Sequence, residues 1–229
     1  MNRLVDVTTS YASSVLALGL GLVARIETRE PDKPLELYEF ESCPFCRKTR
    51  EAFTEMDVSP IVYPCPPGGK RYRDRVVELG GKAQFPFLVD PNTGTQLYES
   101  LDIIRYVADT YGDGKLPFAY RGGPVNTVRS MFASLPRGRV GAIPSRAPEK
   151  PLTLYSFDAS PYCRIAREAL SKLELPYRLI NVGKGSRNRA AFVEKSGKMM
   201  VPYLIDPNTD RAMFESADIA RYLVDTYAT

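Results

Sequence analysis

Two cysteines, Cys43 and Cys46, are the clearest candidates for chemistry in this sequence of 229 residues. They enclose Pro44 and Phe45 and follow an alternating apolar stretch that predicts a strand over residues 35–40. Proline favours the first turn of a helix, so we expect Cys43 at a helix N-terminus, where backbone N–H groups stabilise a thiolate. Cys43 is then a nucleophile, and Cys46 lies within reach to form a disulfide with it. The alternative is a pair of structural thiols.

The sequence repeats itself, and the repeat predicts the architecture. Residues 34–63 and 151–180 share 11 of 30 positions at a shift of 117, and residues 85–112 and 201–228 share 15 of 28 at a shift of 116. In each copy the pattern of apolar residues and turns predicts the order β-α-β-α-β-β-α.

The repeat also predicts the domain boundaries. We expect a leading helix and linker in residues 1–33, a first domain in 34–112, a connector with a helix in 113–150 and a second domain in 151–229. Apolar stretches at residues 15–23 and 128–135 predict the two leading helices, and the first is too short to span a bilayer.

A proline precedes a short strand in both copies, as Phe85-Pro86 and Val201-Pro202. Proline removes a donor from the strand ladder, so its presence there needs a reason. We expect a cis-proline turn that presents the backbone of the preceding residue to a peptide-like ligand. The alternative is an ordinary proline at a strand start.

A Glu-Ser pair opens the last helix of each copy, as Glu99-Ser100 and Glu215-Ser216. The N–H groups of a helix N-terminus bind a carboxylate, the serine adds a donor and the glutamate can pair with an ammonium group. Together they match the γ-glutamyl end of glutathione, which carries both charges on one carbon. We also expect the two serines to cap their helices.

In the second copy the cysteine motif reads Ser160-Pro161-Tyr162-Cys163, so this copy is not expected to carry out dithiol exchange. The Ser160 hydroxyl can donate a hydrogen bond to a glutathione thiolate. The alternative is an inactive scaffold that kept its fold. We expect Cys163 to be a packed thiol.

A loop rich in Pro and Gly holds the fourth cysteine, Cys65, which we interpret as a loop thiol because no helix start supports its reactivity. The alternative is a third redox thiol. Lys70, Arg71 and Arg73 follow it. They can attract the glycine carboxylate of glutathione, or they are solvated surface charges.

The composition limits the remaining function classes. The chain has no His, which excludes Cys-His and Ser-His catalytic pairs, and we expect no metal site. The net charge of +4 comes with no basic run, so no nucleic-acid partner is expected. We expect a soluble protein of a reducing compartment without a transmembrane segment: the cytoplasm or, if a transit peptide was removed, the plastid stroma.

Together the CPFC motif, Pro86 and Glu99-Ser100 resemble the N-terminal domain of glutathione transferases and the related glutaredoxins, over residues 34–112 and 151–228. The tandem arrangement resembles a plant and cyanobacterial glutathione-transferase-like class. The resemblance implies an α/β chain of two tandem thioredoxin-fold domains without the all-helical C-terminal domain of typical transferases. A second-substrate site then lies between the two units or at an oligomer interface, or does not exist.

The resemblance also implies roles for individual residues. Cys43 is implied to be the catalytic thiol, and Ser160 resembles the catalytic serine of the theta and zeta classes. Phe85 and Val201 are implied to bind the cysteinyl backbone of glutathione. Its γ-glutamyl part is implied to bind Glu99, Ser100, Glu215 and Ser216.

The leading hypothesis is a glutathione-dependent thiol transferase, with glutathione as cosubstrate and no metal. Cys43 attacks a glutathionylated or disulfide-bonded protein, and Cys46 or a second glutathione completes the exchange. The alternatives are a glutathione transferase acting on a small electrophile, a non-catalytic glutathione-binding or scaffold protein, and an iron–sulfur site at Cys43. The oligomeric state is left open.

Overall fold

The computed structural model describes residues 20–117, 120 and 141–229. The helix expected over residues 128–135 lies outside the described residues, as does most of the one expected over residues 15–23. The described end of the latter, residues 20–23, forms a turn and an isolated bridge between Val23 and Lys184 instead.

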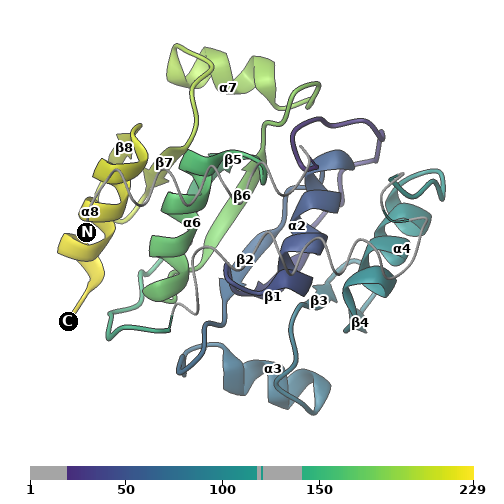
Figure 1. Ribbon diagram of the computed structural model, residues 1–229, viewed down its shortest axis with the longest axis horizontal. Coiled ribbons are helices and arrows are strands. Elements are labelled where there is room, and N and C mark those ends of the chain that lie inside the picture. Colours follow the sequence, from purple (N-terminus) through teal and green to yellow (C-terminus); the bar gives the residue numbers. More distant parts are fainter. Residues whose placement is uncertain (1–19, 118–119, 121–140) are drawn as a thin grey trace.

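Both copies have the element order expected from the sequence, β-α-β-α-β-β-α (Figure 1). The first contains β1 (Glu36–Glu39), α2 (Pro44–Glu55), β2 (Ile61–Pro64), α3 (Arg73–Gly80), β3 (Phe87–Asp90), β4 (Thr95–Leu97) and α4 (Ser100–Tyr111). The second contains β5 (Leu152–Ser156), α6 (Pro161–Lys172), β6 (Tyr177–Asn181), α7 (Arg189–Ser196), β7 (Tyr203–Asp206), β8 (Arg211–Met213) and α8 (Ser216–Tyr227). The prediction of two tandem thioredoxin-fold units is confirmed.

The two units share one eight-stranded sheet with the order β4-β3-β1-β2-β6-β5-β7-β8. The order is symmetrical about its centre, where the edge strands β2 and β6 pair in antiparallel register, with Ile61 opposite Arg178 and Val62 opposite Tyr177. Each unit therefore covers the exposed strand edge of the other, which would otherwise be open to pairing with another chain.

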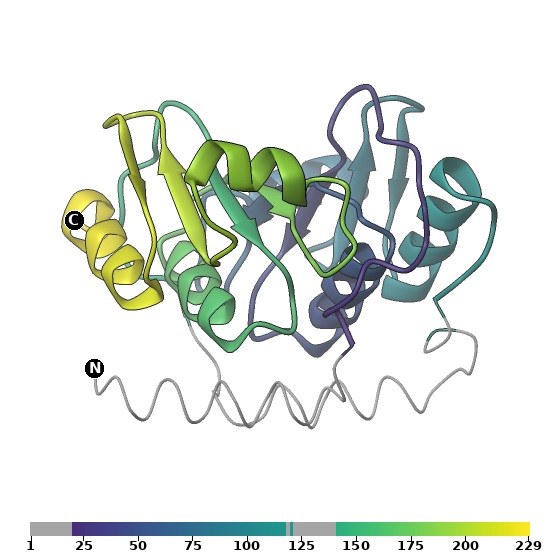
Figure 2. The same cartoon turned by 90° about the horizontal axis from the view of Figure 1, so that it is seen from above.

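Helices α2, α4, α6 and α8 cover one face of the sheet, and α3 and α7 lie on the other (Figures 1 and 2). Alternation along β1 explains the two layers: Leu37 packs with Phe53 and Ile104 under α2 and α4, whereas Tyr38 packs with Val76 of α3. Because β2 and β6 are antiparallel, α2 and α6 begin at opposite ends of the sheet, as Figure 1 shows.

A buried aspartate ties the β3–β4 hairpin to the last helix of each unit. Asp90 Oδ2 accepts hydrogen bonds from the hydroxyls of Tyr106 at 2.6 Å and Tyr111 at 2.5 Å. Asp206 repeats this arrangement with the corresponding two tyrosines of α8. The Asp-Pro-Asn-Thr segment and the later Tyr pair thus recur in both copies because they hold the hairpin against the helix.

Five charged side chains form a buried network at the centre of the molecule, which we call the central ionic cluster. Arg50 Nε lies 2.9 Å from Asp158 Oδ1, and Arg50 also contacts Glu41 at 3.3 Å. Arg167 Nε lies 2.9 Å from Glu41 Oε2 and its Nη2 lies 3.2 Å from Asp158 Oδ1. Glu39 also accepts a hydrogen bond from Arg50 Nη1. Each arginine thereby bridges the carboxylates of both units.

These contacts decide the charge state of two of the carboxylates. Burial alone raises a carboxyl pKa, but Arg167 and Arg50 outweigh it and hold the pKa of Glu41 below its ordinary value. The same balance lowers the pKa of Asp158 to about 2. Removing Arg50 or Arg167 would therefore leave both buried carboxylates with one guanidinium partner fewer.

We predict that Arg167→Met lowers the free energy of unfolding by about 3–5 kcal/mol, because Glu41 and Asp158 each lose a buried partner. Denaturation in urea, followed by circular dichroism, measures this value. Arg221→Met is the control, since Arg221 forms an exposed ion pair with Asp218 at 3.6 Å and should change stability by less than about 0.5 kcal/mol. Equal effects of the two substitutions would show that the cluster contributes no more than a surface pair.

Candidate functional site

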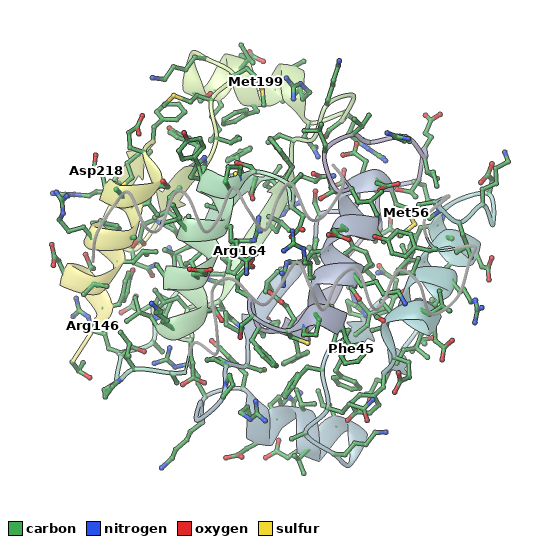
Figure 3. All side chains as sticks on the ribbon, viewed as in Figure 1. Phe45, Met56, Arg146, Arg164, Met199 and Asp218 are labelled. Atoms are coloured by element: carbon green, nitrogen blue, oxygen red, sulfur yellow. The ribbon has the colours of Figure 1, made fainter. Side chains whose placement is uncertain are left out.

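Cys43 is the N-cap residue of α2, as the sequence predicted, with Pro44 in the first helical turn. Its Sγ accepts a hydrogen bond from the backbone N–H of Cys46 at 3.2 Å, so the sulfur satisfies one of the free donors at the helix start. Cys43 is only 5% exposed, whereas the neighbouring Phe45 is 43% exposed at the same end of α2 (Figure 3). The thiol thus lies just below the surface, beside an aromatic side chain open to a ligand.

The environments of the two thiols separate their pKa values. The side-chain hydrogen bond from Cys46 lowers the pKa of Cys43, and backbone N–H groups add to this effect against the cost of burial. Burial raises the pKa of Cys46, which is fully enclosed, and the hydrogen bond to Cys43 raises it further. Cys43 is therefore the more acidic thiol of the pair.

Phe85 lies beside Cys43. The backbone oxygen of Phe85 lies 3.9 Å from Cys43 Sγ, and the Phe85-Pro86 peptide bond is cis. Arg73 places its guanidinium 4.7 Å from the centre of the Phe85 ring. Val201-Pro202 is also cis, so both prolines adopt the turn expected from the sequence.

The Glu-Ser pairs differ from the expectation in one respect. Glu99 and Glu215, not the serines, occupy the N-cap positions of α4 and α8, and neither end has a side-chain cap hydrogen bond. The serines are the first helical residues, so the prediction that Ser100 and Ser216 cap these helices is wrong. Glu99 and Glu215 have φ values of 64° and 66°, unfavourable for a non-glycine residue. Such strain recurs at ligand-binding positions.

The second unit keeps this geometry around a different side chain. Ser160 is the N-cap of α6, and its Oγ accepts a hydrogen bond from the backbone N–H of Cys163 at 3.2 Å. Cys163 is fully buried, as expected for a packed thiol. Gln84, whose Nε2 donates to Glu99, is replaced by Met200 in the second unit, so Glu215 has no equivalent contact from that position.

The loop after β2 joins the units. Arg71 donates to the backbone oxygens of Leu173 at 3.0 Å and Glu174 at 2.6 Å, so it is neither a solvated surface charge nor free for a ligand. Arg73 donates to the Cys65 oxygen at 2.9 Å. Burial raises the pKa of the Cys65 thiol, which agrees with an unreactive role for that residue.

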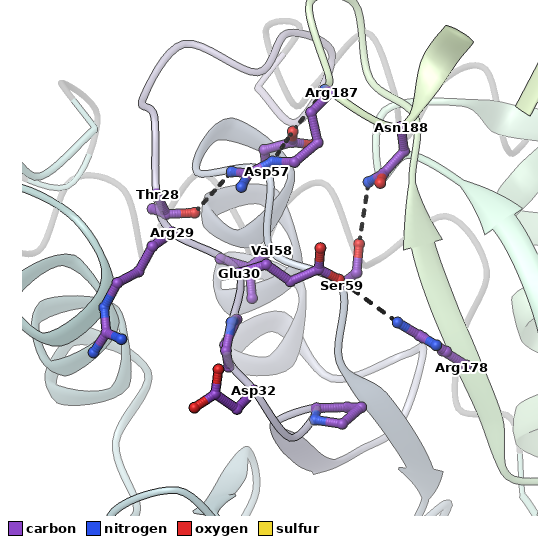
Figure 4. Close-up of a pocket in the computed structure, with 12 residues that line it drawn as sticks. Thr28, Arg29, Glu30, Asp32, Asp57, Val58, Ser59, Arg178, Arg187 and Asn188 are labelled. Atoms are coloured by element: carbon purple, nitrogen blue, oxygen red, sulfur yellow. Dashed lines mark hydrogen bonds and ion pairs between the residues drawn. The ribbon is translucent and has the colours of Figure 1, made fainter. Parts of the chain in front are cut away.

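A polar cavity of about 380 Å³ lies between the units (Figure 4). Arg187 Nε contacts Asp57 at 3.0 Å and Asn188 contacts Ser59 at 3.5 Å across it. Ser59 precedes β2, whereas Cys43 follows the end of the parallel strand β1. The cavity therefore opens at the opposite end of these strands from Cys43.

None of the five residues of the central ionic cluster was predicted from the sequence, including Glu39 and Arg50. The sequence did contain a sign that Glu39 is buried, because Glu39 continues the core-facing alternation of Leu35 and Leu37 in the predicted strand. Arg50 lies one helical turn after Cys46 and so shares its face of α2. A charged residue on a core face is an expected sign of a buried partner.

Two absences concern only the part of the chain that the structure describes. In residues 20–117, 120 and 141–229 no group of three or more His, Cys, Asp or Glu side chains is placed to hold a metal ion. Within the same ranges, no helix is long and apolar enough to cross a membrane.

Comparison with known proteins gives two matches. The family model "Glutathione S-transferase, N-terminal domain" matches twice, over residues 37–121 and 154–229, and together these regions make up most of the chain. A glutathione S-transferase-like protein of Aspergillus fumigatus is 32% identical over 78 residues, which cover 34% of this chain and 34% of that protein. The chain thus matches about a third of the length of this relative. No solved structure matches the chain.

We predict that iodoacetamide modifies Cys43 well before the other three cysteines, and at a lower pH than an ordinary thiol. The thiolate is the reactive form, so the lowered pKa of Cys43 extends its reactivity toward acid, whereas burial keeps Cys46 and Cys65 protonated. Mass spectrometry of peptides after timed labelling between about pH 5 and 9 measures each rate. Modification of Cys65 or Cys163 at the rate of Cys43 would contradict this assignment.

Proposed function

The chain belongs to the family defined by the glutathione S-transferase N-terminal domain, and on this premise we propose that it is a glutathione-dependent thiol transferase with Cys43 as its nucleophile. One observation carries the proposal: at the start of α2, Cys46 donates a hydrogen bond to Cys43 and lowers its pKa. A conjugating transferase needs one group to stabilise the glutathione thiolate. A second thiol within reach of the first serves disulfide exchange instead.

Glutathione fits the groups around Cys43. Its cysteine sulfur would lie at Cys43, and its backbone would pair with that of Phe85, next to the thiolate. The exposed Glu99 would receive the γ-glutamyl ammonium group, and Ser100 with the free N–H groups of α4 would receive the carboxylate. The contact from Gln84 would hold the Glu99 carboxylate in place.

The reaction then has two steps. The Cys43 thiolate attacks a glutathionylated protein, forms a mixed disulfide with glutathione and releases the protein thiol. Cys46 attacks the mixed disulfide, or a second glutathione does so, and glutathione is released. The partners implied are glutathione and a disulfide-bonded or glutathionylated protein, with no metal taking part.

We propose a binding role without thiol exchange for the second unit. It has the cis Val201-Pro202 bond, the strained Glu215 and the buried Ser216 in the same places as the first unit. Ser160 replaces the nucleophile there, and its hydroxyl hydrogen is free to be donated to a sulfur because its oxygen is the acceptor for Cys163 N–H.

We predict that Cys43→Ser abolishes reduction of a glutathionylated peptide, while Cys46→Ser retains part of the activity by the route that uses a second glutathione. Coupled assays with glutathione and glutathione reductase measure both rates. Ser160→Ala, at the matching position of the second unit, serves as the control and should leave the rate unchanged. Equal rates for Cys43→Ser and the unmodified protein would refute the assignment of the nucleophile.

We predict two glutathione sites per chain in calorimetric titration. Ser100→Ala should weaken the first site and Ser216→Ala the second, each by about 10- to 150-fold, since one charge-assisted hydrogen bond contributes about 1.5–3 kcal/mol. The two single variants are matched controls for one another. A single site that survives Ser216→Ala unchanged would restrict binding to the first unit.

A further inference from the structure

The two ends of the junction between the units hold equivalent contacts. At the end with the polar cavity, Arg187 donates to Asp57 Oδ2 through its backbone N–H at 2.8 Å and its Nε at 3.0 Å. At the other end, Arg71 stands at the equivalent position, and its backbone N–H donates to Glu174 Oε1 at 3.0 Å. Each end thus has an arginine of one unit bound to a carboxylate of the other, and this contact joins the units.

The polar lining of the cavity is not needed for that contact, because the other end of the junction lacks it. Four polar residues of the lining have apolar or aromatic equivalents there: Ala147 for Glu30, Pro176 for Ser59, Ile61 for Arg178 and Tyr72 for Asn188. Tyr72 packs against the ring of Tyr63, with ring centres 5.2 Å apart. A polar surface that joining the units does not require is a candidate for binding a ligand.

The two equivalent arginines differ in how many of their donors are used. The guanidinium group of Arg71 donates to three backbone oxygens and to Ser145 Oγ. That of Arg187 donates to Asp57 and, at 3.3 Å, to Thr28 Oγ1, and its Nη1 has no partner among the residues that the structure describes. The Arg187 side chain is 35% exposed, so it has a donor left for a molecule in the cavity.

Opposite walls of the cavity carry opposite charges (Figure 4). Glu30 and Asp32 belong to the segment before β1 of the first unit, whereas Arg178 of β6 and Arg187 belong to the second unit. Glu30 and Arg178 approach to 3.6 Å, but both side chains are exposed, so this ion pair contributes little and opens easily. Asp32 forms no ion pair with any described residue.

The third arginine of the lining has a structural role. Arg29 donates to the Thr110 oxygen at 3.2 Å and lies 4.9 Å from the centre of the Tyr111 ring. Arg146 makes the equivalent contacts at the other end of the junction, with Thr226 and Tyr227. The charges available to a ligand are therefore two guanidinium groups on one wall and two carboxylates on the other.

We propose that this cavity binds a small zwitterion of amino-acid or dipeptide size. Its carboxylate would contact Arg178 and Arg187, and its ammonium group would contact Glu30 and Asp32. A simple anion would lie against two carboxylates and a simple cation against two guanidinium groups, so a molecule with both charges fits best. The volume of about 380 Å³ is in the range of small-molecule sites. This site is separate from the thiol transferase function proposed above.

Thermal unfolding of the whole chain tests the site, with the standard free amino acids and glycylglycine as probes. A molecule that binds the folded chain raises its Tm, and calorimetric titration then gives the Kd of each such probe. We expect binding by at least one probe. Its N-acetyl and amide derivatives, which each lack one of the two charges, should bind at least about tenfold more weakly. No binding by any probe, or equal binding by either derivative, would overturn the proposal.

Variants locate the bound probe. Arg178→Ile and Glu30→Ala introduce the residues that the other end of the junction carries, and each should weaken binding at least about tenfold. Asp32→Ala should do the same, and since Asp32 is exposed and unpaired among the described residues, its replacement should not disturb folding. Glu149→Ala, at the position equivalent to Asp32, is the matched control and should leave binding unchanged. Unchanged affinity in Asp32→Ala and Arg178→Ile would overturn the proposal.

The proposed glutathione sites also accept an ammonium group and a carboxylate, so they need a separate control. Ser100→Ala and Ser216→Ala should leave the affinity for the probe unchanged. Weaker binding in either variant would place the probe in a glutathione site and overturn the assignment to the cavity. Absence of glutathione binding, in contrast, would count against the proposed thiol transferase function and not against this site.

Discussion

The sharing of Arg50 and Arg167 between carboxylates of both units is the constraint on which the rest of the structure depends. The two central strands of the sheet, β2 and β6, pair over only two residue pairs, which is a short strand contact to hold two units together. Buried guanidinium–carboxylate pairs require close geometry, because a displaced partner leaves a desolvated charge. The cluster therefore sets the relative position of α2 and α6, and with them that of the two halves of the sheet.

Joining the units about this cluster also determines where the proposed binding sites lie. Because β2 and β6 are antiparallel, the N-terminus of α2 lies at one end of the sheet and that of α6 at the other. Cys43 and Ser160 consequently lie at opposite ends of the sheet, and the cavity between the units opens away from Cys43. If a substrate protein contacts the Cys43 site, it meets the surface formed by Phe45 and Phe85, not the junction of the units.

The sequence predicted what local patterns and the repeat encode: the element order, the cis-prolines, the helix start at Cys43 and the inert Cys65. It did not predict the continuous sheet, because an edge strand that pairs with a second unit has the same alternation as one that does not. Arg71 was misjudged for the same reason, since its acceptors lie about a hundred residues away in the other unit. The serines were misplaced as caps because Glu99 and Glu215 adopt a positive φ that no local propensity favours.

The two copies differ at the proposed nucleophile and agree in most of the groups proposed to bind the ligand, with Gln84 replaced by Met200 as the exception. The cis-prolines, the strained glutamates and the buried serines after them are the same in both units, although a positive φ at glutamate costs about 1–3 kcal/mol each time. Ser160 instead stands at the position of Cys43, and Ser156 at that of Glu39. The fold accommodates either residue at each position, because Ser160 accepts a hydrogen bond from Cys163 N–H and Ser156 accepts one from Arg167. The two copies thus share the backbone geometry proposed for ligand binding and differ at the proposed nucleophile.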